Sequence, residues 1–232
     1  DVLFDKYRNL PWLIRKVSIT SVPSINALVS LRAIPEGDTQ RKVFIGFGDP
    51  IFSPRQLDQE TAMKKAPVLK SSMFASRGFS VTVRGVRISE KGMLDSKTID
   101  SSLLSQLDRL PDTSEEIMST AGALGADLQK DVFLGKDASE HRVKSTNLTD
   151  RKVVSFATHA LVPGDLDGLD QPALALSSPS VTGEKEDGLL TMGEILKLKI
   201  NADWVVLSAC NTGAAEGQGS EAISGLGKAF FY

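Results

Sequence analysis

Two side chains that can do nucleophilic or acid–base chemistry come directly after two strongly apolar segments of the chain. His159 follows the segment 152–157 (KVVSFA) by one residue, and Cys210 follows the segment 204–209 (WVVLSA). In open α/β sheets, ligands bind outside the carboxyl ends of the strands. If the two segments form neighbouring strands, the imidazole and the thiol face each other across one crevice. That arrangement suits a thiol activated by a histidine.

Such a pair would carry out acyl transfer. The thiolate is the nucleophile, and a neighbouring imidazolium lowers the pKa of a thiol enough to populate the thiolate near neutral pH. The histidine can then give a proton to the leaving amine. The developing oxyanion needs backbone N–H donors, and we expect these from Ala160 and Cys210. The glycine-rich loop after Cys210 would let the backbone approach a bound peptide closely.

Both residues also have ordinary structural interpretations. A lone cysteine is most often a buried small hydrophobe, and a histidine at a strand end is often a satisfied structural residue. The spacing favours the catalytic interpretation, because caspases place their histidine about 50 residues before the cysteine and the separation here is 51. The local caspase pattern Q-A-C-x-G is not met, since Ser208 stands where that pattern has Gln. The other histidine, His141, lies in a predicted helix beside Lys and Arg and is expected at the surface.

The composition excludes several classes of protein. The chain has 232 residues, of which 41% are hydrophobic and 24% charged, as in ordinary globular domains. Its net charge of −2 lacks the basic excess of nucleic-acid binders. One cysteine and two histidines make neither an intrachain disulfide nor a usual structural zinc site, and they fit a reducing compartment. There is no apolar run long enough for a membrane helix and no signal peptide. We therefore expect a cytoplasmic protein without metal or other cofactor, and with no direct contact to nucleic acid or membrane.

The predicted elements alternate between strand and helix. We expect strands at 16–24, 43–48, 131–134, 152–157, 173–176 and 204–209, and helices at 25–34, 113–124, 139–148, 191–200 and 220–232. Capping boxes begin two of the helices, at Thr113 and Thr191, and Gly125 ends the first of them. Alternation of this kind predicts βαβ units and a mainly parallel sheet. The nearly continuous apolar strands predict that helices cover both faces.

The segment 51–109 has a different character. It is rich in Ser and Lys, and it has no long apolar run. Phe79, Val81 and Val83 alternate with polar residues, which indicates an exposed strand. We expect a variable insertion, whose simplest interpretation is a surface decoration. Control of activity is the alternative that its composition leaves open.

The segments around His159 and Cys210 resemble the CHAT domain, a caspase-like peptidase domain often attached to TPR repeats. The resemblance is carried by SFATHAL (155–161), VVLSACNTG (205–213), EAISGLGKAFFY (221–232), VPSINAL (22–28), VFIGFGDPIF (43–52), LPDTSEEI (110–117) and FLGKDASEHRVK (133–144). It covers most of the chain and is weakest across 53–105. One departure is Ala160, where the family often has Gly; Ala is tolerable there if φ stays negative.

The resemblance implies a single domain over 1–232 with an insertion at about 51–109. Its fold would be a caspase-like three-layer α/β sandwich, with a mainly parallel sheet and helices on both faces. The implied activity is that of a cysteine endopeptidase, with His159 and Cys210 as its dyad. The chain would continue at both ends, so that the fold is incomplete at the C-terminus. The implied partners are a protein substrate and an activating sensor or TPR-type protein.

An acidic loop follows the histidine closely and bears on substrate choice. Asp165, Asp167 and Asp170 are candidates for binding substrate, because carboxylates near the cleft favour a basic residue before the scissile bond. Several relatives in the broader caspase clan prefer Arg or Lys, which agrees. The spacing does not fit an EF-hand. A solvated acidic turn is the plain alternative.

The main competing function is a non-catalytic interaction or regulatory module with the same fold, docking partners through its apolar final helix. The presence of both His159 and Cys210 favours the peptidase, since a pseudoenzyme has no chemical need for the pair. Nucleotide binding at 46–48 is poorly supported, because the pattern stops at G-x-G and Ile51 stands where a third glycine would be. The sequence around Ser224 lacks the G-x-S-x-G pattern of serine hydrolases.

Overall fold

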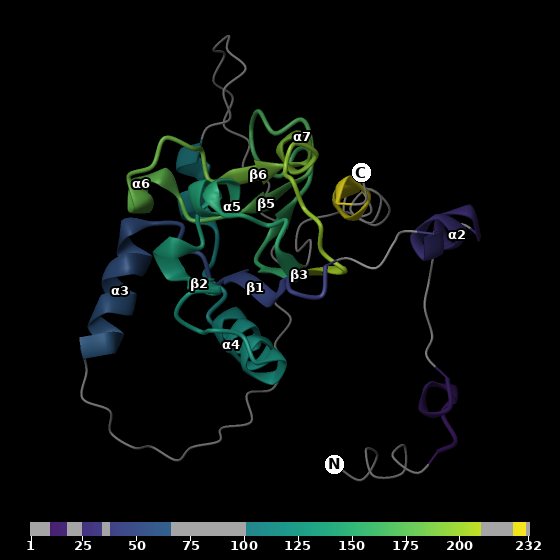
Figure 1. Ribbon diagram of the computed structural model, residues 1–232. Helices are drawn as coiled ribbons and strands as arrows, with labels where there is room; N and C mark the ends of the chain where they lie inside the picture. The colour runs from purple at the N-terminus through teal and green to yellow at the C-terminus, as the bar shows by residue number, and fades with distance from the viewer. Residues whose placement is uncertain (1–9, 18–24, 34–37, 66–100, 210–224, 231–232) are drawn as a thin grey trace. The chain divides into compact units, whose positions relative to one another are not determined.

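The computed structural model describes residues 10–17, 25–33, 38–65, 101–209 and 225–230 (Figure 1). The chain divides into two compact units, Asp1–Thr39 and Gln40–Tyr232.

The described part of the first unit contains the short 3-10 helix η1 (Leu13–Arg15) and helix α2 (Ile25–Ala33). Helix α2 confirms the helix predicted at 25–34. The strand predicted at 16–24 lies mostly outside the described residues.

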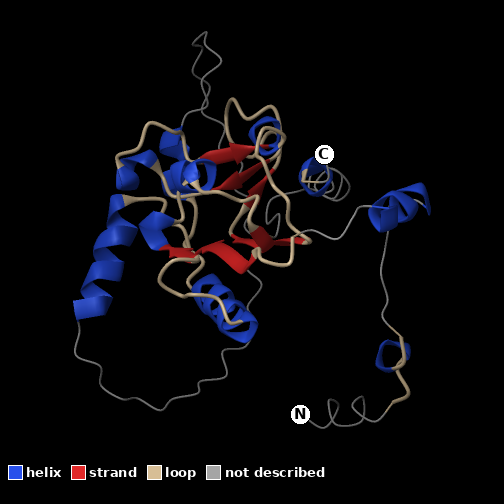
Figure 2. Ribbon diagram, viewed as in Figure 1, coloured by secondary structure: helices blue, strands red, loops and turns tan. Residues whose placement is uncertain are grey.

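A four-stranded parallel sheet forms the centre of the second unit (Figure 2). Its strands are β1 (Lys42–Gly48), β2 (Val132–Leu134), β3 (Arg151–Ala157) and β7 (Trp204–Ser208). They are arranged in the order β2-β1-β3-β7, and each neighbouring pair runs parallel. The parallel sheet expected from the apolar runs is therefore confirmed.

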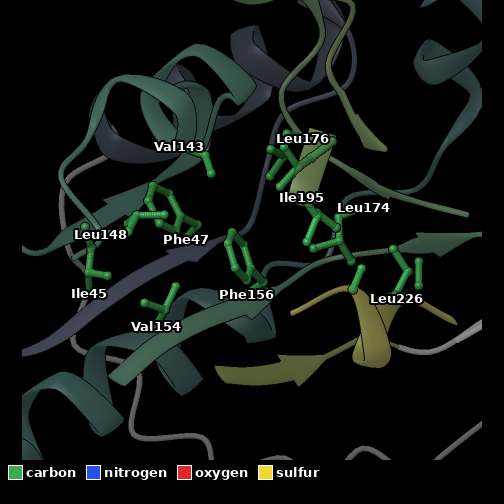
Figure 3. Packing of buried hydrophobic residues seen from close by; sticks show 13 residues of the cluster. Ile45, Phe47, Val143, Leu148, Val154, Phe156, Leu174, Leu176, Ile195 and Leu226 are labelled. Atoms are coloured by element: carbon green, nitrogen blue, oxygen red, sulfur yellow. The ribbon is translucent and has the colours of Figure 1, made fainter. Parts of the chain in front are cut away.

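Successive side chains of these strands point to opposite faces of the sheet. On one face, Phe44 packs against Ile117 and Ala121 of α4 (Asp112–Leu124). On the other face, Phe47 and Phe156 stack with ring centroids 5.3 Å apart. They belong to a hydrophobic cluster to which several strands and helices contribute side chains (Figure 3). Its buried members are Ile45, Phe47, Val143, Leu148, Val154, Phe156, Ala160, Leu174, Leu176, Leu190, Ile195, Leu226 and Ala229. Helices thus cover both faces, as expected.

A second, three-stranded antiparallel sheet lies on the second of these faces. It consists of β4 (Ala160–Leu161), β5 (Ala173–Ala175) and β6 (Leu189–Thr191), in the order β4-β5-β6. Only β5 was predicted. The other two strands are two and three residues long, and β5 itself has three residues.

The two predicted capping boxes have different outcomes. The box at Thr191 forms and begins α7 (Met192–Ile195). The box at Thr113 is wrong, because α4 begins at Asp112 and the Thr113 hydroxyl donates to the Leu110 carbonyl instead, at 2.7 Å. Gly125 ends α4 with φ at 73°, as predicted.

Two helices are shorter than the sequence predicted. Helix α5 (Glu140–Ser145) ends because Thr146 is extended and its hydroxyl donates to the Arg142 carbonyl. After α7, Leu198 donates to the carbonyl of Ile195, which is an i→i+3 bond rather than a helical one. The remaining short helices are η3 (Gly135–Asp137) and α6 (Pro179–Thr182), and residues 225–229 are helical.

The described part of the segment 51–109 contains α3 (Pro54–Lys65), which was not predicted, and the 3-10 helix η2 (Ser101–Gln106). The predicted strand at Phe79–Val83 lies outside the described residues, and the single domain over 1–232 with an insertion stays a prediction. No helix in the described part of the chain has the length and apolar character needed to cross a membrane.

Candidate active site

The carboxyl ends of β1, β3 and β7 lie side by side. Ala157 pairs with Gly48 on one side and with Ser208 on the other. The ladder continues one step further, since the Thr158 N–H donates to the Ser208 carbonyl at 3.3 Å. His159 comes two residues after Ala157, and Cys210 comes two residues after Ser208. Cys210 itself lies outside the described residues.

His159 is held at the end of β3 with 8% of its surface exposed. Its Nε2 atom is 2.8 Å from the carbonyl oxygen of Asp108. A carbonyl can only accept, so Nε2 carries the proton and, in the neutral ring, Nδ1 has the free lone pair. The buried Phe52 ring packs beside the imidazole, with centroids 5.7 Å apart. The ring is therefore oriented by a hydrogen bond at Nε2 and packed against Phe52.

The backbone at the histidine is fixed by β5. The Ala175 N–H donates to the His159 carbonyl at 2.9 Å, and the Thr158 hydroxyl donates to the Ala175 carbonyl. These bonds tie the two residues after β3 to the central strand of the three-stranded sheet.

Ala160, a predicted oxyanion donor, begins β4 and pairs with Leu174. The ladder bond between the two strands runs from Ala175 to His159, which makes this a non-hydrogen-bonded pair. The Ala160 N–H therefore points away from β5. Among the described residues, Asp49 is the non-glycine residue with positive φ, so Ala160 meets the condition set for replacing Gly.

The three acidic loop residues have different environments. Asp165 accepts a hydrogen bond from the Val162 N–H at 2.8 Å and stabilises the turn after β4. Asp167 and Asp170 are exposed. The loop is anchored beneath by Leu166 and Leu169, which are buried in a cluster with Phe52.

The contacts made by residues 107–109 were not predicted from the sequence. Arg109 donates two hydrogen bonds to Asp49, at 2.8 and 2.7 Å, and Asp49 directly follows β1. Asp108 contacts His159 through its backbone carbonyl. A contact made by a main-chain atom has no signature in residue type. The pair Asp49-Pro50 indicated only a turn.

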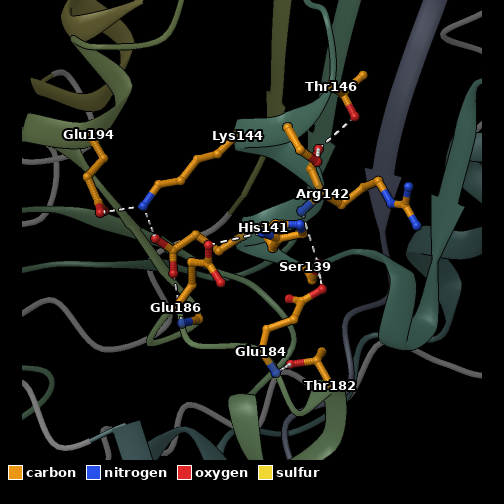
Figure 4. A network of polar contacts seen from close by, with 12 residues as sticks. Ser139, His141, Arg142, Lys144, Thr146, Thr182, Glu184, Glu186 and Glu194 are labelled. Atoms are coloured by element: carbon orange, nitrogen blue, oxygen red, sulfur yellow. Dashed lines mark hydrogen bonds and ion pairs between the residues drawn. The ribbon is translucent and has the colours of Figure 1, made fainter.

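A second polar cluster joins α5 to α7 and to the loop before β6 (Figure 4). Lys144 donates to Glu140 and to Glu194, and the Gly188 N–H donates to Glu140 at 2.9 Å. Burial raises the pKa of Glu140 to about 7, although Lys144 acts against this. Burial also disfavours the charge of Glu194, but the hydrogen bonds from Lys144 and Thr191 and the charge of Lys144 together outweigh it and lower the pKa of that carboxyl.

The predicted surface histidine, His141, belongs to the same region and is exposed. Its Nδ1 lies 3.0 Å from a carboxylate oxygen of Glu186, and this hydrogen bond lowers the pKa of Glu186. In the part of the chain that the structure describes, no group of His, Cys, Asp and Glu side chains could hold a metal ion.

A parallel sheet with helices on both faces, and a histidine at a strand end beside the strand that leads to a cysteine, define a caspase-like α/β protein. The family model of the CHAT domain matches residues 3–232. The chain therefore belongs to the CHAT-domain family, which confirms the resemblance found in its sequence. No curated protein and no solved structure gives a match to the chain.

Proposed function

We propose that the chain is a cysteine endopeptidase whose dyad is His159 and Cys210. The observation that carries the proposal is the register between β3 and β7. His159 and Cys210 each follow by two residues a pair of directly opposed residues, Ala157 and Ser208. Membership of a caspase-like peptidase family supports the same assignment.

The hydrogen bond of His159 supports a role for Nδ1 as the ring atom that does the chemistry. Because Nε2–H is donated to the Asp108 carbonyl, Nδ1 accepts the proton of the Cys210 thiol. The thiolate attacks the scissile carbonyl carbon, and the N–H groups of Ala160 and Cys210 stabilise the oxyanion. The imidazolium gives its proton to the leaving amine, which leaves a thioester. A water molecule, deprotonated by His159, then hydrolyses the thioester and frees the second product.

The proposed substrate is a protein with a basic residue before the scissile bond. The acidic loop begins a few residues after His159, and its exposed carboxylates at Asp167 and Asp170 can attract a cationic side chain. Asp165 is partly committed to the turn. Peptides with Arg before the cut should be cleaved faster than peptides with Asp, and the reverse order would contradict this specificity.

The proposed setting is cytoplasmic, with an activating sensor or TPR-type protein as partner. The single cysteine supports a reducing compartment. The support for a regulatory partner is the segment 51–109, whose described part reaches the histidine through Asp108.

The test is the rate at which iodoacetamide alkylates Cys210 as a function of pH. The chain has one cysteine, so the signal is unambiguous. In the native chain we expect fast alkylation well below pH 8.5, the pKa of a free thiol. His159→Ala should remove that advantage, with a rate at pH 6.5 lower by about tenfold or more. His141→Ala, which changes the other histidine, should leave the pH profile unchanged.

Slow alkylation with an ordinary pH profile in both the native chain and His159→Ala would overturn the dyad. The non-catalytic interaction module would then be the better account of the same fold.

A further inference from the structure

The histidine is oriented by an anchored segment of backbone. We propose that Arg109 and Asp49 are positioning residues, which fix the tautomer and direction of the His159 ring by holding the Asp108 carbonyl against it. The proposal rests on the proposed function for its catalytic meaning, but the geometry that it predicts can be measured without any activity.

The ion pair of Arg109 with Asp49 is the stronger of the two anchors. The guanidinium donates Nε–H and Nη2–H to the two carboxylate oxygens, at 2.8 and 2.7 Å. Such bidentate pairs fix orientation as well as distance. The two side chains are 19% and 5% exposed, and Glu60 of α3 lies 3.7 Å from the same guanidinium. Asp49 directly follows β1, so the residue next to Asp108 is tied to the sheet that carries His159.

The second anchor acts on the other neighbour of Asp108. Gln56 of α3 donates its Nε2–H to the Leu107 carbonyl at 2.8 Å. Its Oε1 accepts from the Phe52 N–H, also at 2.8 Å. Phe52 is the residue whose ring packs on His159. Asp108 is therefore held on both sides, by residues that also touch the surroundings of the histidine.

The backbone of Asp49 indicates that its position is specifically held. Its φ is 50°, a left-handed conformation that costs energy for a residue with a side chain. Its N–H donates to the Thr113 hydroxyl at 2.8 Å. The strained turn points the carboxylate at Arg109 while the backbone is bound to α4.

A purely structural role is the competing explanation, and the chain offers a matched control for it. Arg151 and Asp131 form another buried ion pair, with side chains 6% and 9% exposed. This pair lies at the amino ends of the strands, where Arg151 also donates to the Phe44 carbonyl at 3.1 Å. Arg151→Lys removes the same guanidinium fork as Arg109→Lys but leaves the carboxyl ends untouched.

The first measurement is the tautomer of His159 from nitrogen NMR of the full chain. The chain has two histidines, so His141 is an internal reference. We expect the Nε2–H tautomer of His159 in the native chain and in Arg151→Lys, and a mixture of tautomers in Arg109→Lys. An unchanged Nε2–H tautomer in folded Arg109→Lys would overturn the proposal.

The second measurement is Cys210 alkylation against pH in the same variants. Arg109→Lys should lower the rate at pH 6.5 by about tenfold, as loss of an orienting partner typically does, and Arg151→Lys should not. If the alkylation rate of Cys210 in the native chain does not depend on His159, the proposed peptidase fails. The tautomer of His159 then still tests the role of Arg109. If the native chain shows the histidine-dependent increase in alkylation rate and Arg109→Lys keeps all of it, the positioning role is overturned, but the proposed peptidase is not.

Gln56→Met covers the case in which Arg109→Lys does not fold. It removes the second anchor and keeps the length of the side chain. We expect a smaller increase in the minor tautomer of His159 and a smaller loss of rate. A Gln56→Met chain with native tautomer and native rate would then stand against the proposal.

Discussion

At the scale of single residues, the least ordinary ionisable group is Glu140. It is buried at the start of α5, where it shares Lys144 with Glu194. Burial raises its pKa from 4.5 to about 7. In the unfolded chain the same carboxyl titrates near its usual value. Between pH 4.5 and 7 the folded chain therefore holds a proton that the unfolded chain has lost, so Glu140 makes stability fall as the pH rises.

Glu140→Gln should remove this fall in stability. Gln resembles the protonated carboxyl, so the variant and the native chain should be similarly stable at pH 5. At pH 8 the variant should have gained about 1–3 kcal/mol relative to the native chain, since one pKa unit corresponds to about 1.4 kcal/mol. Urea unfolding at pH 5, 6, 7 and 8 measures the difference.

Glu194→Gln is the control for Glu140. Both carboxylates bind Lys144, but the pKa of Glu194 is lowered. Titration of Glu194 therefore changes the stability of the fold only at pH values near and below 4.5. This variant should keep most of the decline in stability between pH 5 and 7. An unchanged decline in Glu140→Gln would mean that burial does not hold the proton on Glu140.

At the scale of elements, the approach of α4 to β1 depends on two glycines. A Cβ atom at Gly46 would lie 2.7 Å from Ile117 of α4 and from Phe44, and one at Gly48 would lie 2.9 Å from Ile117 and 3.2 Å from the Thr113 carbonyl. The G-x-G pattern, weighed above as a weak nucleotide-binding signal, therefore has a packing explanation. It lets helix α4 lie closely on β1, the strand that Asp49 directly follows.

Gly46→Ala should destabilise the fold by about 1–3 kcal/mol, the usual cost of overpacking. Gly122→Ala is the matched control, because it makes the same change within α4 where a Cβ would meet nothing within 4 Å. There the higher helix propensity of Ala should stabilise the chain by up to about 1 kcal/mol. The midpoint of thermal unfolding should fall for Gly46→Ala and rise for Gly122→Ala. A loss of stability in both variants would count against the packing explanation.

The success of prediction also varied between elements, for a physical reason. Strands β1 and β3 are mostly buried on both faces, whereas Trp204 and Val206 of β7 are exposed; all three strands have apolar runs from which they could be predicted directly. Helix α3 has a mostly polar sequence, and its anchoring by Gln56 and Glu60 depends on residues far along the chain. Tertiary contacts of that kind leave no local pattern. The candidate dyad could be read from strand ends, whereas the Asp108 carbonyl that orients it could not.

At the scale of the whole molecule, the described buried cores belong to one of the two units. The three clusters of buried residues fall between Val43 and Phe230, and the second unit begins at Gln40. Arg41, near its start, pairs with Asp203 at 2.6 Å and fastens the entry to β1 to the segment before β7. A unit with its own core and a fastened end has what it needs to fold alone.

The chain 40–232 should therefore fold without residues 1–39. We expect its thermal midpoint within a few degrees of that of the full chain, because no described core residue is lost. Cys210 should also keep its alkylation profile, since Asp49, Arg109 and His159 all lie in this unit. Hydrogen exchange that protects 1–39 as strongly as β1 and β3, together with loss of folding on truncation, would instead favour the single domain over 1–232 that the sequence predicts.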